Sequence, residues 1–237
     1  PESNINNFSS LKIEFDTYLS EFGPFQFQPF SEYKVFEEMI RDRSDGLFVL
    51  SSWHYKQLRH NYSLTPVLVG SLKGKISQKR VLTVLKNVSG VDGIRGGIVA
   101  SAGNEIFTRN VLSDMLDEQQ LVDSCKVLTV PKDIDALMSV TFRMADAAVT
   151  TENSLNKLAK LNPKQYKMLK ILMSGNETLR PIVAVPAEKT DNLEQLISTI
   201  ENMGSGFRGR TRLRMLGLDG WKKINSTELN EIINDKI

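Results

Sequence analysis

The sequence is poor in the residues that build disulfides and metal centres. Cys125 is the only cysteine among 237 residues, and His54 and His60 are the only histidines. A single cysteine cannot form an intramolecular disulfide, and these three residues are too few for a cysteine-rich or histidine-rich metal site. We therefore expect no metal and no cofactor.

Long apolar runs and a strong net charge are missing as well. No run approaches the roughly 18 apolar residues that a membrane-spanning helix needs, so we expect no direct membrane insertion. Residues 1–7 are polar and do not resemble a signal peptide. A formal net charge of +2 gives no reason to expect nucleic acid, and we interpret the four arginines from Arg208 to Arg214 as a solvated face.

Signatures of catalysis are absent too. The sequence has no Gly-x-Ser-x-Gly elbow, no Walker-type Gly-Lys-Ser/Thr and no histidine–carboxylate metal spacing. We interpret the neighbouring carboxylates Asp133 and Asp135 as residues at a helix start. A binding protein is therefore predicted rather than an enzyme, with an enzyme on the same fold kept as an alternative.

Short apolar runs that alternate with amphipathic segments make up most of the chain. Hydrophobic residues account for 41% and charged residues for 24%, as in an ordinary globular protein. This alternation predicts an α/β fold with mostly parallel sheets flanked by helices. The runs interpreted as strands are 25–28, 47–50, 66–70, 81–85, 97–100, a region of Leu121, Val122 and 127–130, then 146–149, 170–173 and 182–185.

The most informative stretch is residues 88–115, which reads VSGVDGIRGGIVASAGNEIFTRNVLSDM. It predicts a strand, a corner of small residues and a helix. Such a corner offers backbone N–H groups to an anion at the helix start. The alternative is an ordinary N-cap that only satisfies the first turn, and the sequence leaves both open. The corner consists of Ser101, Ala102, Gly103 and Asn104.

Three other polar segments follow predicted strands, where α/β sheets bind ligands. Each segment also has a purely structural alternative. Trp53 and Tyr55 can pack a helix against the core, Glu152 or Asn153 can cap a helix, and residues 176–177 can line only a hinge. His54 is expected on a helix surface. A carboxylate that faced the ligand would favour a cationic or neutral ligand group. The candidates are Ser51, Ser52, Trp53 and Tyr55; Thr150, Thr151 and Glu152; and Asn176 and Glu177.

The order of these signals resembles the type II periplasmic binding proteins, in particular the phosphonate/phosphate-type substrate-binding components of ABC transporters. The resemblance runs from about Leu11 to the C-terminus. Phosphonate binders carry a dense Ser/Thr cluster at the helix start, whereas the corner here has one hydroxyl, Ser101. The matching segments are 45–55 (DGLFVLSSWHY), 91–97 (VDGIRGG) with Ser101, 144–147 (MADA), 171–181 (ILMSGNETLRP) and 216–221 (LGLDGW).

The resemblance implies a two-lobed protein with a ligand cleft between lobes. We expect crossovers near Lys86–Asn87 and Glu177–Pro181, giving one lobe of residues 1–86 and 178–237 and another of 87–177. A periplasmic or extracytoplasmic location and an ABC transporter permease as partner follow from the family. The same fold as the sensor domain of a histidine kinase or other receptor is the alternative. We also expect that the chain begins after the family's first strand.

Overall fold

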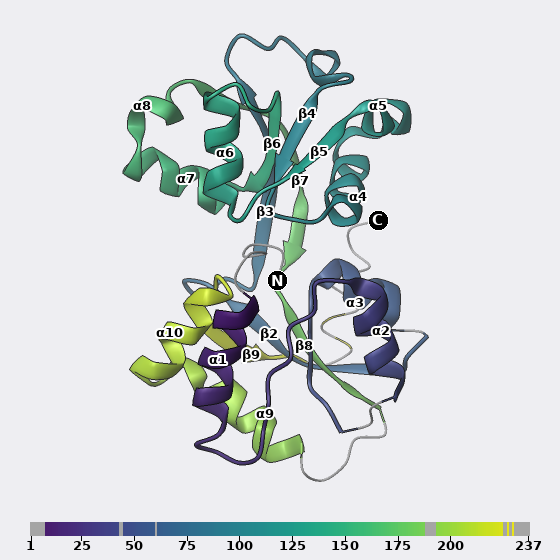
Figure 1. Ribbon diagram of the computed structural model, residues 1–237, viewed down its shortest axis with the longest axis vertical. Helices are drawn as coiled ribbons and strands as arrows, with labels where there is room; N and C mark the ends of the chain where they lie inside the picture. Colours follow the sequence, from purple (N-terminus) through teal and green to yellow (C-terminus); the bar gives the residue numbers. More distant parts are fainter. Residues whose placement is uncertain are drawn as a thin grey trace. The chain divides into compact units, whose positions relative to one another are not determined.

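The computed structural model describes residues 8–42, 45–59, 61–187 and 193–224, together with 227 and 229. The described chain forms two compact α/β units (Figure 1). Unit 1 contains the described residues up to Ser77 and from Leu179 onwards, and unit 2 is Gln78–Thr178. Capping roles that the sequence suggests for Thr190 and for Asn225 with Glu228 lie outside the described residues.

The chain enters unit 2 earlier than the expected crossover at Lys86–Asn87. The passage falls at Ser77/Gln78, and the return falls at Thr178/Leu179. The early entry has a simple cause, because strand β3 (Ser77–Leu85) pairs with β6 (Ala147–Thr151) from Arg80 to Val84 and so belongs to unit 2.

The unit 1 sheet has the order β1-β8-β2-β9. All its described pairs are antiparallel, which differs from the mostly parallel sheet expected from the sequence. The reason is that β8, entering from unit 2, is inserted between β1 and β2 and runs against both. The strands are β1 (Phe48–Leu50), β2 (Leu64–Ser71), β8 (Ile182–Pro186) and β9 (Gly220–Lys223).

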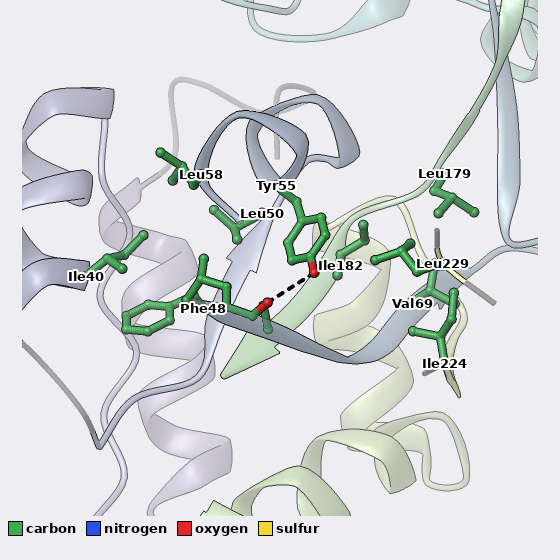
Figure 2. Close-up of a cluster of buried hydrophobic side chains, with 12 residues drawn as sticks. Ile40, Phe48, Leu50, Tyr55, Leu58, Val69, Leu179, Ile182, Ile224 and Leu229 are labelled. Carbon is green, nitrogen blue, oxygen red and sulfur yellow. Dashed lines mark hydrogen bonds between the residues drawn. The ribbon is translucent and has the colours of Figure 1, made fainter. Parts of the chain in front are cut away.

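Helices cover both faces of this sheet. Alternation along the strands sends Val69 and Ile182 into one apolar cluster and Leu68 and Val183 into another. Figure 2 shows the first cluster, which includes Tyr55. The helices are α1 (Phe8–Leu19), α2 (Tyr33–Asp42), α3 (Ser52–Leu58), α9 (Leu193–Glu201) with the short 3-10 helix η2 (Asn202–Gly204), and α10 (Phe207–Met215).

The prediction of a strand at residues 25–28 is wrong. Phe27 donates its N–H to Asp16 Oδ1 (2.6 Å), and its carbonyl accepts from Lys12 Nζ (3.0 Å). Phe25 and Phe27 pack against the cluster beside α1. Side chains of α1 thus satisfy backbone groups that a neighbouring strand would otherwise bind.

The unit 2 sheet is mixed, with the order β5-β4-β6-β3-β7. Strand β4 (Ile98–Ser101) pairs in parallel with β5 (Lys126–Thr129) and β6, whereas β3 runs antiparallel to β6. Strand β7 (Leu169–Leu179) includes residues 174–177, which had been expected to interrupt a shorter strand.

Two helical layers enclose the unit 2 sheet (Figure 1). One packs on Leu82 and Val99 and the other on Val81 and Ala100. Leu121 and Val122, expected in a strand region, lie in α5. The first layer has η1 (Val91–Ile94), α4 (Glu105–Leu116) and α5 (Gln119–Ser124); the second has α6 (Asp133–Thr141), α7 (Glu152–Leu161) and α8 (Pro163–Tyr166). Among the described helices, none has the length and apolar character to cross a bilayer.

Candidate functional site

One edge of the unit 2 sheet brings two predicted corners together. Strands β4 and β6 are parallel neighbours, with Ser101 paired to Val149. Their carboxyl ends therefore meet at the same edge, so residues 101–104 and 150–152 lie side by side. Arg80 of β3 stands directly opposite Thr151 in the ladder and belongs to this edge as well.

The 101–104 corner is a tight turn that leads into α4. Ser101 is buried, and its Oγ accepts a hydrogen bond from the Gly103 N–H (3.1 Å). Asn104 is the N-cap of α4, since its Oδ1 accepts from the Phe107 N–H (2.9 Å). The capping alternative therefore describes Asn104, and an anion would rely on the other first-turn N–H groups.

Those N–H groups belong to Glu105 and Ile106, the first two residues of α4. An α-helix cannot bond its first N–H groups internally, because no carbonyl precedes them at the right spacing. Gly103 keeps the approach clear of a side chain, and a Cβ there would lie 2.3 Å from Cδ1 of Phe107. The corner can thus present backbone donors at close range.

Arg80 is a candidate that our reading of the sequence missed. Its guanidinium carbon lies 4.5 Å from the centroid of the Phe107 ring. Because Phe107 is in the first turn of α4, this contact brings a positive charge to the helix start. The sequence offered one weak signal, a basic residue directly before the apolar run 81–85.

The 150–152 corner is organised by Asp133, the first residue of α6. Asp133 Oδ2 accepts from Thr151 N (3.1 Å), Thr151 Oγ1 (3.0 Å) and Ser154 Oγ (2.8 Å). Thr151 is the N-cap of α7, so the alternative of a cap at Asn153 or Glu152 is wrong. Asp133 starts a helix, as predicted, and also ties α6 to α7.

The other two members of this corner differ in exposure. Thr150 is fully buried, and its Oγ1 has no hydrogen-bond partner among the described residues. Glu152 is exposed in the first turn of α7. Of these two side chains, only that of Glu152 can reach a ligand without rearrangement.

Asn176 and Glu177 lie in strand β7, exposed, rather than in a loop. Their neighbour Gly175 faces Met115 of α4 and the backbone of Arg80, because a Cβ at Gly175 would lie 2.9 Å from Met115 Cε and 3.6 Å from Arg80 O. This part of β7 therefore runs beside the β3 segment that carries Arg80.

In unit 1 the predicted polar segment forms the start of α3. Ser51 is its N-cap and accepts from the His54 N–H (3.2 Å), and Ser52 is the first helical residue. Tyr55 is 3% exposed and donates its hydroxyl to Leu64 O (3.2 Å) (Figure 2). Burial raises the pKa of Tyr55. The structure thus gives Tyr55 the packing role that had been its alternative.

His54 is buried, which contradicts the expected surface position. Its Nε2 lies 3.0 Å from Glu37 Oε1 of α2. The rings of Tyr33, Phe36 and Trp53 surround it, with centroids 4.6, 5.7 and 6.0 Å away. Trp53 is half-buried in this aromatic group. His54 therefore joins α2 to α3, and the helical periodicity alone did not reveal its partner.

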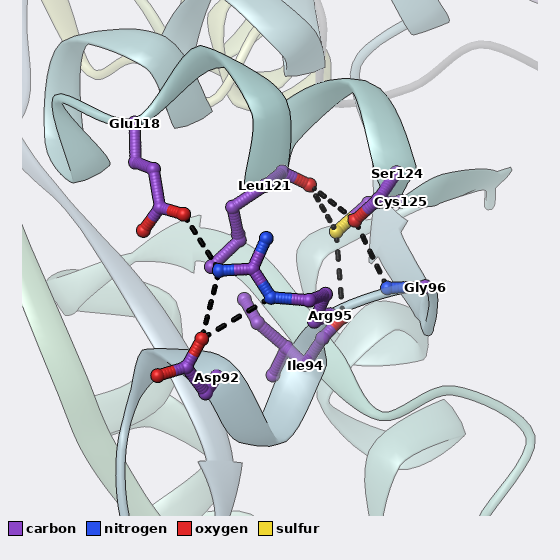
Figure 3. Close-up of polar contacts among 8 residues, drawn as sticks. All are labelled: Asp92, Ile94, Arg95, Gly96, Glu118, Leu121, Ser124 and Cys125. Carbon is purple, nitrogen blue, oxygen red and sulfur yellow. Dashed lines mark hydrogen bonds and ion pairs between the residues drawn. The ribbon is translucent and has the colours of Figure 1, made fainter.

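The loop before β4 is fixed by polar contacts (Figure 3). Arg95 binds Asp92 (2.8 Å) and Glu118 (2.6 Å), and Gly96 donates its N–H to Ser124 Oγ (3.0 Å). Cys125 is buried, and burial raises the pKa of its thiol. These contacts hold both ends of α5 against the loop and strand that lead to the 101–104 corner.

Two α/β units, one of them built from two separate stretches of chain, define the class of two-lobed periplasmic binding proteins. A model of the family described as ABC transporter, phosphonate, periplasmic substrate-binding protein matches residues 17–229. The chain belongs to this family. No curated protein sequence matches it significantly.

Several solved structures have a similar fold. A binding protein component of an ABC phosphonate transporter from Pseudomonas aeruginosa has 12% identity and a TM-score of 0.69, covering 96% of this chain and 80% of that one. A Prochlorococcus marinus protein in complex with methylphosphonate has 16% identity and a TM-score of 0.65, covering 99% and 95%. A Xanthomonas citri protein bound to ATP has 13% identity and a TM-score of 0.64, covering 98% and 94%.

Family membership fixes the general role. The protein is a substrate-binding component of an ABC transporter that binds a small ligand, and its family is one of transport proteins rather than enzymes. The family also implies an extracytoplasmic location.

Proposed function

We propose that the protein captures a phosphonate-like anion in the periplasm for delivery to an ABC transporter permease, and that the anionic group binds at the start of α4. The observation that carries this proposal is the contact between Arg80 and Phe107 in the first turn of α4, next to the N–H groups of Glu105 and Ile106. Helix start and guanidinium both favour negative charge at one place.

The corner supplies most of its donors from the backbone. The N–H groups of Glu105 and Ile106 and the Ser101 hydroxyl are the proposed contacts, while Ala102, Gly103 and Asn104 shape the turn around them. The helix dipole contributes about 0.3–1 kcal/mol to such an anion. Backbone donors can replace the dense hydroxyl cluster of other phosphonate binders, so one serine is sufficient.

The 150–152 corner limits the chemistry of the rest of the ligand. Glu152 is exposed at the start of α7, beside the 101–104 corner, and Asn176 and Glu177 are exposed on β7. Carboxylates beside an anion are costly unless a cationic or neutral group separates them. We therefore propose a phosphonate with an uncharged or ammonium-bearing substituent rather than a second acidic group. Thr150 and Thr151 remain proposed ligand neighbours at this strand end, Thr150 through its backbone and Thr151 by position, since Asp133 already accepts the Thr151 N–H.

From unit 1 we propose contacts by Ser51, Ser52 and Trp53 at the start of α3. Tyr55 supports them from the core through its hydroxyl bond to Leu64. Trp53 is half-buried, and an apolar substituent of the ligand is proposed to contact the exposed part of its ring.

A thermal-shift screen tests the proposal. A ligand that binds the folded state raises Tm in proportion to RT ln(1 + [L]/Kd). Alkylphosphonates and aminoalkylphosphonates should raise Tm, whereas polyamines should not. Ser101→Ala should reduce the shift, and Ser139→Ala, another buried serine of unit 2, should leave it unchanged. A screen in which phosphate, phosphonates and sulfonates all fail would contradict the proposal.

A further inference from the structure

Although the net charge of the chain is small, unit 2 contains a strongly basic segment. Between residues 153 and 176 there are five lysines and no acidic residue. Four of them, Lys157, Lys160, Lys164 and Lys167, are exposed on α7, α8 and the turn that follows. No ion pair involves these four in the described part of the chain, so their charge is not neutralised locally.

Large apolar side chains are exposed in the same segment. Leu161 is 68% exposed at the last turn of α7, and Tyr166 and Met168 are 37% and 42% exposed around α8. Phe142 and Met144, which follow α6, are 61% and 62% exposed. Apolar side chains of this size rarely gather at the surface of a monomeric protein without a partner.

The fold brings these two groups to one end of unit 2. Helices α6 and α7 start together, because Asp133 of α6 binds Thr151 and Ser154 of α7. They pack against each other and run for 9 and 10 residues, which is about 14 and 15 Å. Their carboxyl ends therefore lie near each other, with α8 directly after, on one side of the sheet (Figure 1).

A backbone bond closes this end of the unit. Lys86, at the end of β3, donates its N–H to Met168 O (2.9 Å), so β3 and the α8 turn meet there. Arg143, between Phe142 and Met144, adds another exposed cation. The acidic residue nearest in sequence is Asp146, whose Oδ2 accepts from the Ile98 N–H (2.7 Å). We call this end the basic-apolar patch: Phe142, Arg143, Met144, Lys160, Leu161, Lys164, Tyr166, Lys167 and Met168.

We propose that the basic-apolar patch docks on an anionic lipid surface. Unpaired lysines interleaved with exposed Leu, Met and aromatic side chains match the two components of interfacial binding: attraction to acidic headgroups and shallow insertion of apolar groups. A nucleic acid would suit the cations, but not exposed aliphatic groups such as Leu161 and Met168. The patch lies opposite the edge that carries Ser101 and Thr151, so ligand capture and docking are independent.

Co-sedimentation of the full chain with lipid vesicles tests this proposal. The protein should sediment with vesicles that contain phosphatidylglycerol and remain free with phosphatidylcholine alone. Each lysine near an acidic surface is worth about a fivefold change in partition. The triple variant Lys160→Glu, Lys164→Glu, Lys167→Glu should therefore lose on the order of 100-fold.

A matched control reverses three exposed lysines elsewhere, Lys34→Glu, Lys56→Glu and Lys126→Glu, and should lose far less. The uncharged pair Leu161→Ser and Met168→Ser should also weaken partition, since it removes the apolar component. If charge reversal unfolds the chain, the triple glutamine variant at 160, 164 and 167 provides the same comparison.

Three results would overturn the proposal: no preference for phosphatidylglycerol, an equal loss in the control triple, or release from the vesicles by duplex DNA at equal phosphate concentration. Methylphosphonate affinity should be unchanged in every variant that folds.

Discussion

The guanidinium carbon of Arg80 lies 4.5 Å from the centroid of the Phe107 ring. Arg80 comes from β3 and Phe107 from the first turn of α4, so the contact joins a cation to the helix start proposed to hold the ligand anion. Gly103 packs under the same ring, because any Cβ there would overlap Phe107. One aromatic ring thus positions both the charge and the turn.

Replacing Arg80 should weaken phosphonate binding. We expect Arg80→Gln to lower the affinity for methylphosphonate by at least about tenfold, since a hydrogen bond from a charged guanidinium to an anion is worth about 1.5–3 kcal/mol. Isothermal titration measures the change. Arg95→Gln is the control, because Arg95 is exposed and engaged by Asp92 and Glu118. Equal losses in the two variants would show that the effect is not local.

Removing the Asp133 carboxylate should destabilise the fold. Asp133 Oδ2 accepts three hydrogen bonds that join α6 to α7. We expect Asp133→Ala to lower the free energy of unfolding by about 2–3 kcal/mol, because a buried charged acceptor leaves its donors unpaired when it is lost. Urea denaturation measures this. Asp135→Ala, at the same helix start, should cost less than 1 kcal/mol, or roughly the dipole term alone.

Asp16 should make part of the stability depend on pH. Burial acts to raise its pKa, but the hydrogen bonds from Lys12 and from the Phe27 N–H outweigh burial, so the pKa lies below its ordinary value. A lowered folded-state pKa stabilises the protein above the unfolded value of about 3.9, and this contribution is lost as the pH falls through the folded value.

The corresponding variant is Asp16→Asn. Above about pH 5 it should be less stable than the parent by about 1 kcal/mol, a figure kept small because the pair is partly exposed. The difference should shrink in acid below about pH 4. Glu38→Gln, an exposed carboxylate of α2, serves as the control. A difference that stays constant from neutral to acid pH would contradict the role of the Asp16 charge.

Much of the fold could be predicted from periodicity. The apolar runs at 47–50, 66–70, 81–85, 97–100 and 182–185 all lie in strands, except for the first residue of 47–50 and of 97–100, because a buried strand needs a short continuous apolar stretch. Strand direction was not visible in the same way. An apolar run does not indicate which strand it pairs with or in which direction. Strand β8 takes its place between β1 and β2 of unit 1 only after the chain has passed through unit 2.

The parts of the site that come from one short segment could be predicted from the sequence, whereas the parts that come from distant segments could not. The 101–104 corner follows from a strand–turn–helix pattern within a few residues. Arg80 joins it from β3 and lies 21 positions before Ser101 in the sequence, so no local signal connects the two. The buried position of His54 could not be predicted for the same reason, since its partner Glu37 lies on another helix.

The most direct test of the account removes a backbone donor from the start of α4. Glu105 is the first residue of the helix, where proline is tolerated, and Asn104 has the extended backbone (φ −69°, ψ 174°) that a following proline requires. Glu105→Pro therefore deletes one N–H while the helix stays intact, and Glu105→Ala removes the same side chain but keeps the N–H. Titration with methylphosphonate should give about tenfold weaker binding for the proline variant than for the alanine variant, a loss of about 1.4 kcal/mol, at equal Tm. Equal affinities in the two variants would contradict an anion bound at this helix start.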